Sequence, residues 1–181
     1  MNRTFTEMLQ QSLKDAHETF EKTMEGVTQE VAHFQPPGKA LPIGAAYAHT
    51  VVSEDILLQN WVRKEKSLLE SGWETKIGLS EPHPVMDENW ETNYTAWVKN
   101  VKVDLPKLRE YGQAVYKQTD DFLTGLTDKD IVEMKVDLSS MGEKEWSLGR
   151  FIIRYLLSHI DSLCGEISAI KGVQGLKGYP F

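Results

Sequence analysis

The chain has a single cysteine, Cys164, among its 181 residues. One cysteine excludes an internal disulfide and is typical of a protein kept in a reducing compartment. The sequence has no apolar run of the kind found in a signal peptide, and none of the ~18 to 20 residues that a membrane-spanning helix requires. We therefore expect a cytoplasmic protein with no signal peptide and no membrane partner.

Positive charge is also scarce, since 20 lysines and arginines face 27 aspartates and glutamates and the formal net charge is -7. This is the wrong sign for contact with a phosphate backbone, so we expect no nucleic-acid partner. Prolines are few, at 7. The length fits one domain, residues 1–181, which is long enough to bury a core without disulfides or a structural metal.

Apolar residues recur at steps of three and four, the period of amphipathic helices. The stripes predict four helices, over residues 5–34, 43–71, 105–126 and 148–172. Asp104 and Ser147 are the predicted N-caps of the last two, because a short polar side chain can accept a hydrogen bond from the first turn. Gly72 is a predicted left-handed cap after the second helix.

Two connections are too long or too patterned for simple turns. Residues 73–103 contain Trp90, Tyr94 and Trp97 at helical spacing, which predicts a short extra helix inside a crossover. A crossover of this length lets the second and third helices lie parallel. Residues 131–137 alternate apolar and polar like a short strand, half of a β-hairpin closed around Gly142. The fold class is therefore an all-α four-helix bundle with a small hairpin before the last helix.

Two histidines stand in the apolar helices. His49 lies early in the second helix within "IGAAYAHTVVSED", and His159 lies in the fourth within "SHIDSLCGEI", where Gly165 follows. Together with the helix order and the long second crossover, these motifs resemble the DinB/YfiT-like superfamily over roughly residues 5–175.

The resemblance implies an up-down-down-up bundle that forms homodimers and binds a divalent metal, zinc or nickel, through three histidines. His49 and His159 occupy two of the ligand positions. The third falls on Leu163, four residues after His159. Histidines at i and i+4 share a helix face because four residues turn a helix by about 400°. Leucine offers no lone pair, so the usual three-ligand site is incomplete here.

No neighbouring polar residue is well placed to supply the missing ligand. Ser162 and Ser53 face the expected cavity but are poor zinc ligands, and Glu54 and Asp55 are turned away from His49. Glu166 is on the correct face but roughly two turns from His159, so it would line the cavity rather than bind metal directly. We therefore expect four residues to line the cavity: Leu163, Glu166, Ser53 and Ser162.

The other histidines give weaker signals. His17 and His33 lie off the apolar stripe of the first helix, which predicts surface positions. His83 lies in "EPHPV", where an exposed position, a lid and simple packing are all compatible with the pattern. A single histidine among apolar residues is more often a hydrogen-bonded core residue than a ligand.

Two functions remain open. The first is a metal-dependent transferase that uses a small thiol, or a hydrolase, with His49 and His159 as metal ligands and a small-molecule substrate. The second is a metal-free relative that acts as a non-catalytic homodimer or binds a small molecule beside Leu163. Nothing in the sequence identifies the substrate.

Overall fold

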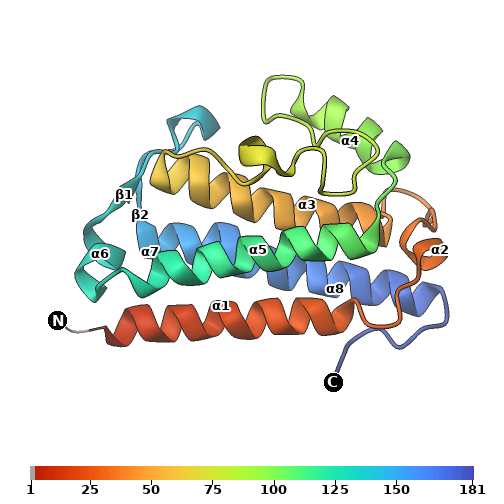
Figure 1. Cartoon of the computed structure of the whole chain (residues 1–181), viewed down its shortest axis with the longest axis horizontal. Coiled ribbons are helices and arrows are strands. Elements are labelled where there is room, and N and C mark those ends of the chain that lie inside the picture. Colours follow the sequence, from red (N-terminus) through yellow and green to blue (C-terminus); the bar gives the residue numbers. More distant parts are fainter. Residues whose placement is uncertain (1–2) are drawn as a thin grey trace.

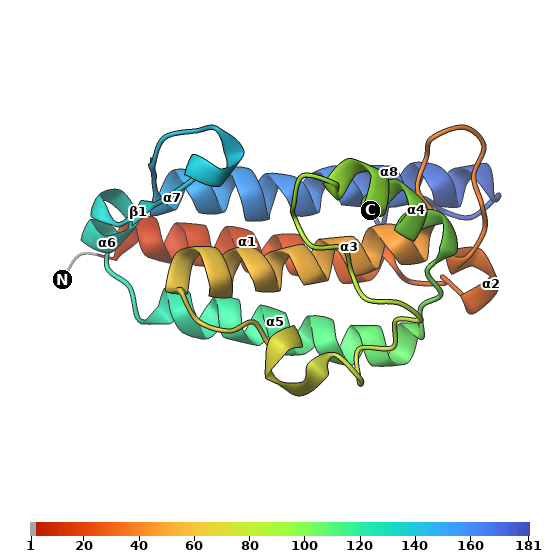
Figure 2. The ribbon, with the colours of Figure 1, turned by 90° about the horizontal axis from the view of Figure 1, so that it is seen from above.

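The computed structural model describes residues 3–181 and shows an all-α bundle of four long helical segments (Figure 1). These segments are α1 (Thr4–Thr23), α3 (Ile43–Ile56), α5 (Leu105–Thr124), and a last one built from α7 (Leu148–Phe151), a π-helical stretch (Ile152–Leu157) and α8 (Ser158–Val173). In Figures 1 and 2, α1 and α8 run one way, and α3 and α5 run the other. The predicted up-down-down-up order is therefore confirmed.

The core lies where each of α1 and α3 packs against both α5 and α8. The last helix shows why: its buried residues recur at steps of three and four, the spacing that keeps one face of a helix toward its neighbours. They include Ile152, Leu156, Ile160, Leu163, Ile167 and Ile170. Within residues 3–181, no helix is long and apolar enough to cross a bilayer.

The first helix is shorter than predicted. The expected helix over residues 5–34 ends at Thr23, and Gly26 has a φ of 74°, a left-handed conformation that interrupts the helix. Thr28 then starts a separate short helix, α2 (Gln29–Ala32), and its side chain accepts a hydrogen bond from the Val31 N–H. The apolar period continues across this break, so the pattern alone could not reveal it.

The second helix also breaks earlier than residue 71. A π-helical continuation of α3, Leu57–Arg63, ends at Lys64, which adopts a left-handed φ of 58°. The Asp55 carboxylate accepts hydrogen bonds from the N–H groups of Leu68 and Leu69, at 3.0 Å each. These bonds start a new short segment, Leu69–Trp73, in which Gly72 is left-handed, as predicted.

The crossover contains the predicted extra helix, α4 (Trp90–Asn100). The hairpin is much smaller than expected, because residues Asp128–Glu133 form α6 under a capping box made by Thr127 and Asp130. Only β1 (Lys135–Val136) and β2 (Trp146–Ser147) pair, in antiparallel register, and a short 3-10 turn (Ser139–Met141) lies between them. The predicted strand over residues 131–137 was therefore wrong for its first half.

Both predicted N-caps are present. The Asp104 side chain accepts from the Lys107 N–H, and the Ser147 side chain accepts from the Arg150 N–H. These bonds satisfy amide groups that have no partner inside the helix. They define where α5 and α7 begin.

Two glycines of the last helix allow a matched test of this packing. A Cβ at Gly149 would lie 2.7 Å from Cγ2 of Ile131, whereas a Cβ at Gly165 would meet no atom within 4 Å. We expect Gly149→Ala to lower the free energy of unfolding by about 1 to 3 kcal/mol through overpacking. Gly165→Ala should raise it by up to about 1 kcal/mol, because alanine favours helix. Urea denaturation measures both, and equal effects would contradict the described contact of α7 with α6.

Candidate functional site

Three imidazoles from three separate parts of the chain meet beside α3. The rings of His49 (α3) and His159 (α8) lie edge to face with centroids 5.0 Å apart. His83, from the crossover, places its Nε2 3.1 Å from Nδ1 of His49. The structure thus brings together the two histidines singled out in the sequence and adds a third.

His83 is the residue that sequence reasoning left undecided. It is 9% exposed, and its ring lies against Trp97 at 4.9 Å between centroids, so it is a packed residue. Its Nδ1 lies 3.0 Å from the Pro84 carbonyl oxygen. The flanking prolines restrict the backbone here, which is the one local signal that His83 has a fixed orientation.

The hydrogen bonds of His83 determine the tautomers of both rings. A carbonyl oxygen only accepts, so Nδ1 of His83 carries a hydrogen and donates it to Pro84. In the neutral ring, Nε2 of His83 is then the acceptor, and Nδ1–H of His49 is the donor. Ser53 Oγ lies 3.3 Å from the same Nδ1 of His49. The remaining lone pair of His49 is therefore on Nε2.

All three rings are held in the neutral form. Burial, followed by the neighbouring His159 and His83, lowers the pKa of His49 to about 3. Burial lowers the pKa of His83 to about 4, although the bond to the Pro84 carbonyl opposes the change. Burial also lowers the pKa of His159. Neutral imidazoles donate and accept hydrogen bonds but bring no positive charge to a ligand.

Helix α4 supplies the cover that buries these rings. Tyr94 lies 4.8 Å from His49 between ring centroids, and Trp90 lies 5.7 Å from His83. Trp90 and Tyr94 stack on each other at 5.0 Å. The helical spacing of Trp90, Tyr94 and Trp97 thus positions one aromatic face over the histidines, which explains their lowered pKa values.

A cavity of about 400 Å³ opens over His49 and His83. Its apolar wall includes Leu57, Trp61, Leu69, Val85, Met86 and Trp90. A second cavity of about 420 Å³ lies next to it and shares Leu69, Glu70, His83 and Val85. The volume, the apolar wall and the few polar groups are those of a small-molecule site.

Of the four residues expected to line the cavity, the structure brings only Ser53 to it. Leu163 is buried in the helical core, at 6% exposure. Ser162 is exposed and donates to the Ser158 carbonyl. Glu166 is exposed. Burial of Tyr94 raises the pKa of its hydroxyl, and the charge of Glu166 raises it further. The cavity therefore opens along α3 and the crossover, not along α8.

A second buried polar cluster lies on the other side of α3, and His17 belongs to it. His17 was predicted at the surface but is 8% exposed, with Nε2 2.9 Å from the Glu54 carboxylate. Thr119 donates its hydroxyl to the same carboxylate. Glu54 does turn away from His49, as expected, yet its charge favours the protonated form of His159 and so opposes the lowering of the pKa of that ring.

His33 was also predicted at the surface. It is half-buried instead, and its Nε2 accepts a hydrogen bond from the Val103 N–H at 2.9 Å. Since α2 is a separate helix, the direction of this side chain could not be inferred from the stripe of α1. His33 therefore ties α2 to the start of α5 and takes no part in the imidazole site.

The donor set does not fit a resident metal in this arrangement. Zinc sites in proteins use three or four protein ligands, but the Nε2 lone pair of His83 is used by His49, and Leu163 has none to offer. Two nitrogens remain, Nε2 of His49 and one of His159. Within residues 3–181, no three or more His, Cys, Asp or Glu side chains are grouped so as to hold a metal ion.

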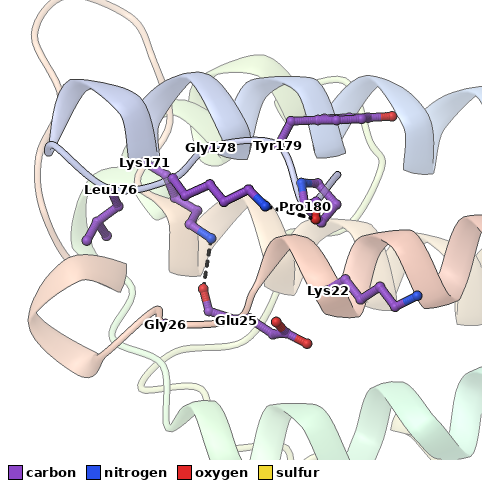
Figure 3. Close-up of a pocket in the computed structure, with 9 residues that line it drawn as sticks. Lys22, Glu25, Gly26, Lys171, Leu176, Gly178, Tyr179 and Pro180 are labelled. Carbon is purple, nitrogen blue, oxygen red and sulfur yellow. Dashed lines mark hydrogen bonds between the residues drawn. The ribbon is translucent and has the colours of Figure 1, made fainter.

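Another cavity, of about 290 Å³, lies where the C-terminal residues pass the end of α1 (Figure 3). Lys171, 4% exposed, donates through Nζ to the carbonyl oxygens of Thr23 and Glu25, at 2.8 Å each. Lys177 donates to the Pro180 carbonyl at 3.3 Å. These cations bind the chain's own oxygens: Lys171 ties α8 to the end of α1, and Lys177 makes a bond within the C-terminal residues.

The lowered pKa values predict a pH dependence of stability. Below the ordinary value of 6.5, the unfolded chain protonates its histidines, whereas folded His49 stays neutral down to about pH 3. The free energy of unfolding should therefore fall as the pH falls, by about 1.2 kcal/mol for His49 between pH 6 and 5. In His49→Gln, the change in the free energy of unfolding between pH 6 and 5 should be smaller by the contribution of His49.

Urea denaturation of both proteins at several pH values measures the difference. Between pH 7 and 8 the slopes should nearly coincide, because His49 is neutral in the folded state and mostly neutral in the unfolded state there. Equal slopes between pH 6 and 5 would show that His49 titrates normally and is not buried in this cluster.

The fold has a solved counterpart. The crystal structure of a conserved protein from Enterococcus faecalis superimposes with a TM-score of 0.73, covering 97% of this chain and 99% of that one at 18% sequence identity. At this identity the likeness shows the fold alone. A search of the curated proteins finds no match.

The family model of the DinB superfamily matches residues 12–159, from α1 to the start of α8 and so through His49 and His159. This match spans most of the chain and agrees with the up-down-down-up bundle. The chain belongs to the DinB superfamily.

Proposed function

We propose that this chain binds a small, mainly apolar molecule in the cavity over His49 and His83, and that the neutral His49 ring contacts the ligand as an acceptor through Nε2, because both nitrogens of His83 already have partners. The observation that carries the proposal is the cavity itself, about 400 Å³ with an apolar wall and a polar floor. Cavities of roughly 300 to 1,000 Å³ with this composition are typical of small-molecule sites.

The floor favours binding over metal chemistry. The His49–His83 hydrogen bond fixes both rings, and the lowered pKa values keep them uncharged at neutral pH. A fixed neutral ring with one free acceptor, Nε2 of His49, can orient a ligand without the cost of burying a charge.

A metal-dependent transferase or hydrolase, which the family resemblance implies, requires more than this arrangement provides. A third nitrogen must become available, either because the His49–His83 bond breaks or because another group replaces Leu163. We therefore place this function second. The predicted homodimer and the cytoplasmic location remain predictions, and light scattering of the purified chain tests the first of them.

The binding proposal is tested with neutral aromatic probes, namely benzyl alcohol, 3-phenylpropanol and tryptophol, by isothermal titration calorimetry in buffer with EDTA. We expect saturable binding that tightens with the apolar area of the probe. Trp61→Ala removes part of the cavity wall and should weaken binding about tenfold or more, since a buried aromatic ring contributes ~1.5 to 3 kcal/mol.

Trp146→Ala is the matched control, because Trp146 packs against Tyr155 and lines neither cavity. Binding to none of the three probes would contradict the proposal. Near-stoichiometric zinc or nickel in untagged protein, lost in His49→Ala, would favour the metal-dependent function instead.

Leu163→His tests whether the scaffold retains the metal geometry of its family. The new imidazole stands one turn after His159, and His49 lies against His159. We expect this variant, unlike the wild type, to be stabilised by zinc in thermal unfolding, by about 2.7 kcal/mol at zinc concentrations 100 times the dissociation constant. Leu163→Gln is the control without a ligand nitrogen. No zinc effect would show that His49 and His159 are not directed at a common point.

A further inference from the structure

The charged residues around the cavity are all of one sign. Among the described residues that line it and its neighbour, Glu70, Glu74 and Glu81 carry charge and no lysine or arginine is present. The neutral histidines add no positive charge. An anionic ligand would find no counter-ion in the lining, whereas a cation would find carboxylates. Lys66, whose charge acts on Glu70, lines neither cavity.

Glu70 is the one carboxylate shared by both cavities. Its Oε2 accepts three hydrogen bonds, from Asn60 Nδ2 at 2.8 Å, from the Ser67 N–H at 2.9 Å and from Ser67 Oγ at 3.0 Å. These bonds lower the pKa of Glu70, so the group is ionised at neutral pH. Among residues 3–181, no hydrogen bond to Oε1 is formed, which leaves that oxygen for a ligand.

The backbone holds Glu70 in this position. Lys64 turns the chain after Arg63 through its left-handed conformation, and Asp55 binds the N–H groups of Leu68 and Leu69. The segment that carries Glu70 is therefore folded back toward α3. A carboxylate fixed in this way loses little conformational freedom when it binds a partner.

The aromatic side chains of the cavity wall also favour a cationic ligand. Trp61 and Trp90 line the cavity that contains Glu70. The face of an indole ring attracts a cation, and it also packs well against hydrocarbon. An ammonium group next to an aromatic or aliphatic body matches both parts of the wall.

We infer that the ligand of this cavity is an organic cation, an amine on an apolar or aromatic body, with its ammonium group bound by Glu70 and its body between Trp61 and Trp90. This inference rests on the proposed small-molecule function and names the chemical class of its ligand. The net charge of -7 also favours the approach of cations over long distances.

The experiment compares three indoles of similar shape, tryptamine (cation), tryptophol (neutral) and indole-3-acetate (anion), by calorimetry at pH 7. We expect tryptamine to bind about threefold to fivefold tighter than tryptophol, because Glu70 is exposed and water weakens an ion pair at the surface. Indole-3-acetate should bind most weakly. Added salt should reduce the advantage of tryptamine.

Glu70→Gln keeps the shape and an acceptor oxygen but removes the charge, and it should bring tryptamine to the affinity of tryptophol. Glu110→Gln is the matched control: Glu110 is exposed on α5, lines neither cavity and changes the net charge equally. Because Glu70 also holds Asn60 and Ser67, thermal unfolding of both variants accompanies the titrations. If Glu70→Gln unfolds too readily, the wild type alone tests the inference, through the salt dependence of tryptamine binding and the relative affinities of the three indoles.

The outcomes separate the two proposals. If none of the indoles binds, the small-molecule function itself is wrong. If tryptophol binds but tryptamine has no advantage, or if Glu110→Gln removes the advantage as fully as Glu70→Gln does, the cavity is a ligand site and the assignment of an amine is overturned.

Discussion

The hydrogen bond between His49 and His83 is the constraint on which this account of the site depends. It joins α3 to the crossover, 34 residues later in the chain, at 3.1 Å. Because the other nitrogen of His83 donates to a carbonyl, the bond has one direction only. It uses the lone pair that a metal would need, and it holds the floor of the cavity in a single arrangement.

The polar side chains of helix α3 form three separate hydrogen-bonded groups, and the His49–His83 bond belongs to one of them. Nearly all of its side chains are buried, and its polar residues point in three directions. His49 and Ser53 face the crossover, Glu54 binds His17 and Thr119, and Asp55 binds Tyr111 and the segment at Leu68. Buried polar groups are tolerated where they are hydrogen-bonded. Each of the three groups has its own hydrogen-bond partners. The side of α3 that faces the cavity can therefore bind a ligand, while the other polar residues stabilise the core.

The sequence predicted much of this architecture because its signals are local. Asp104 and Ser147 act as N-caps through bonds within three residues, and Gly72 takes a left-handed turn within its own segment. Helical periodicity also located α4. The breaks near Gly26 and Lys64 escaped prediction, because the apolar period continues through them and their cause is backbone conformation.

The site was only half predictable. The resemblance pointed to His49 and His159, whose rings do lie together, but no local pattern indicated that the crossover returns His83 to the same place. The burial of His17 was missed because its partner, Glu54, is 37 residues away. Contacts between distant segments depend on how helices pack, and the spacing of residues along one helix carries no record of them.

The most direct test of the central claim is nitrogen NMR of the histidine rings at pH 7, recorded as two-bond ¹H–¹⁵N correlation spectra with and without zinc. We expect His49 and His83 to be both neutral with the hydrogen on Nδ1, and zinc to leave the Nε2 resonance of His83 unchanged. An imidazolium at either position, or a zinc-induced shift of that resonance, would contradict the claim.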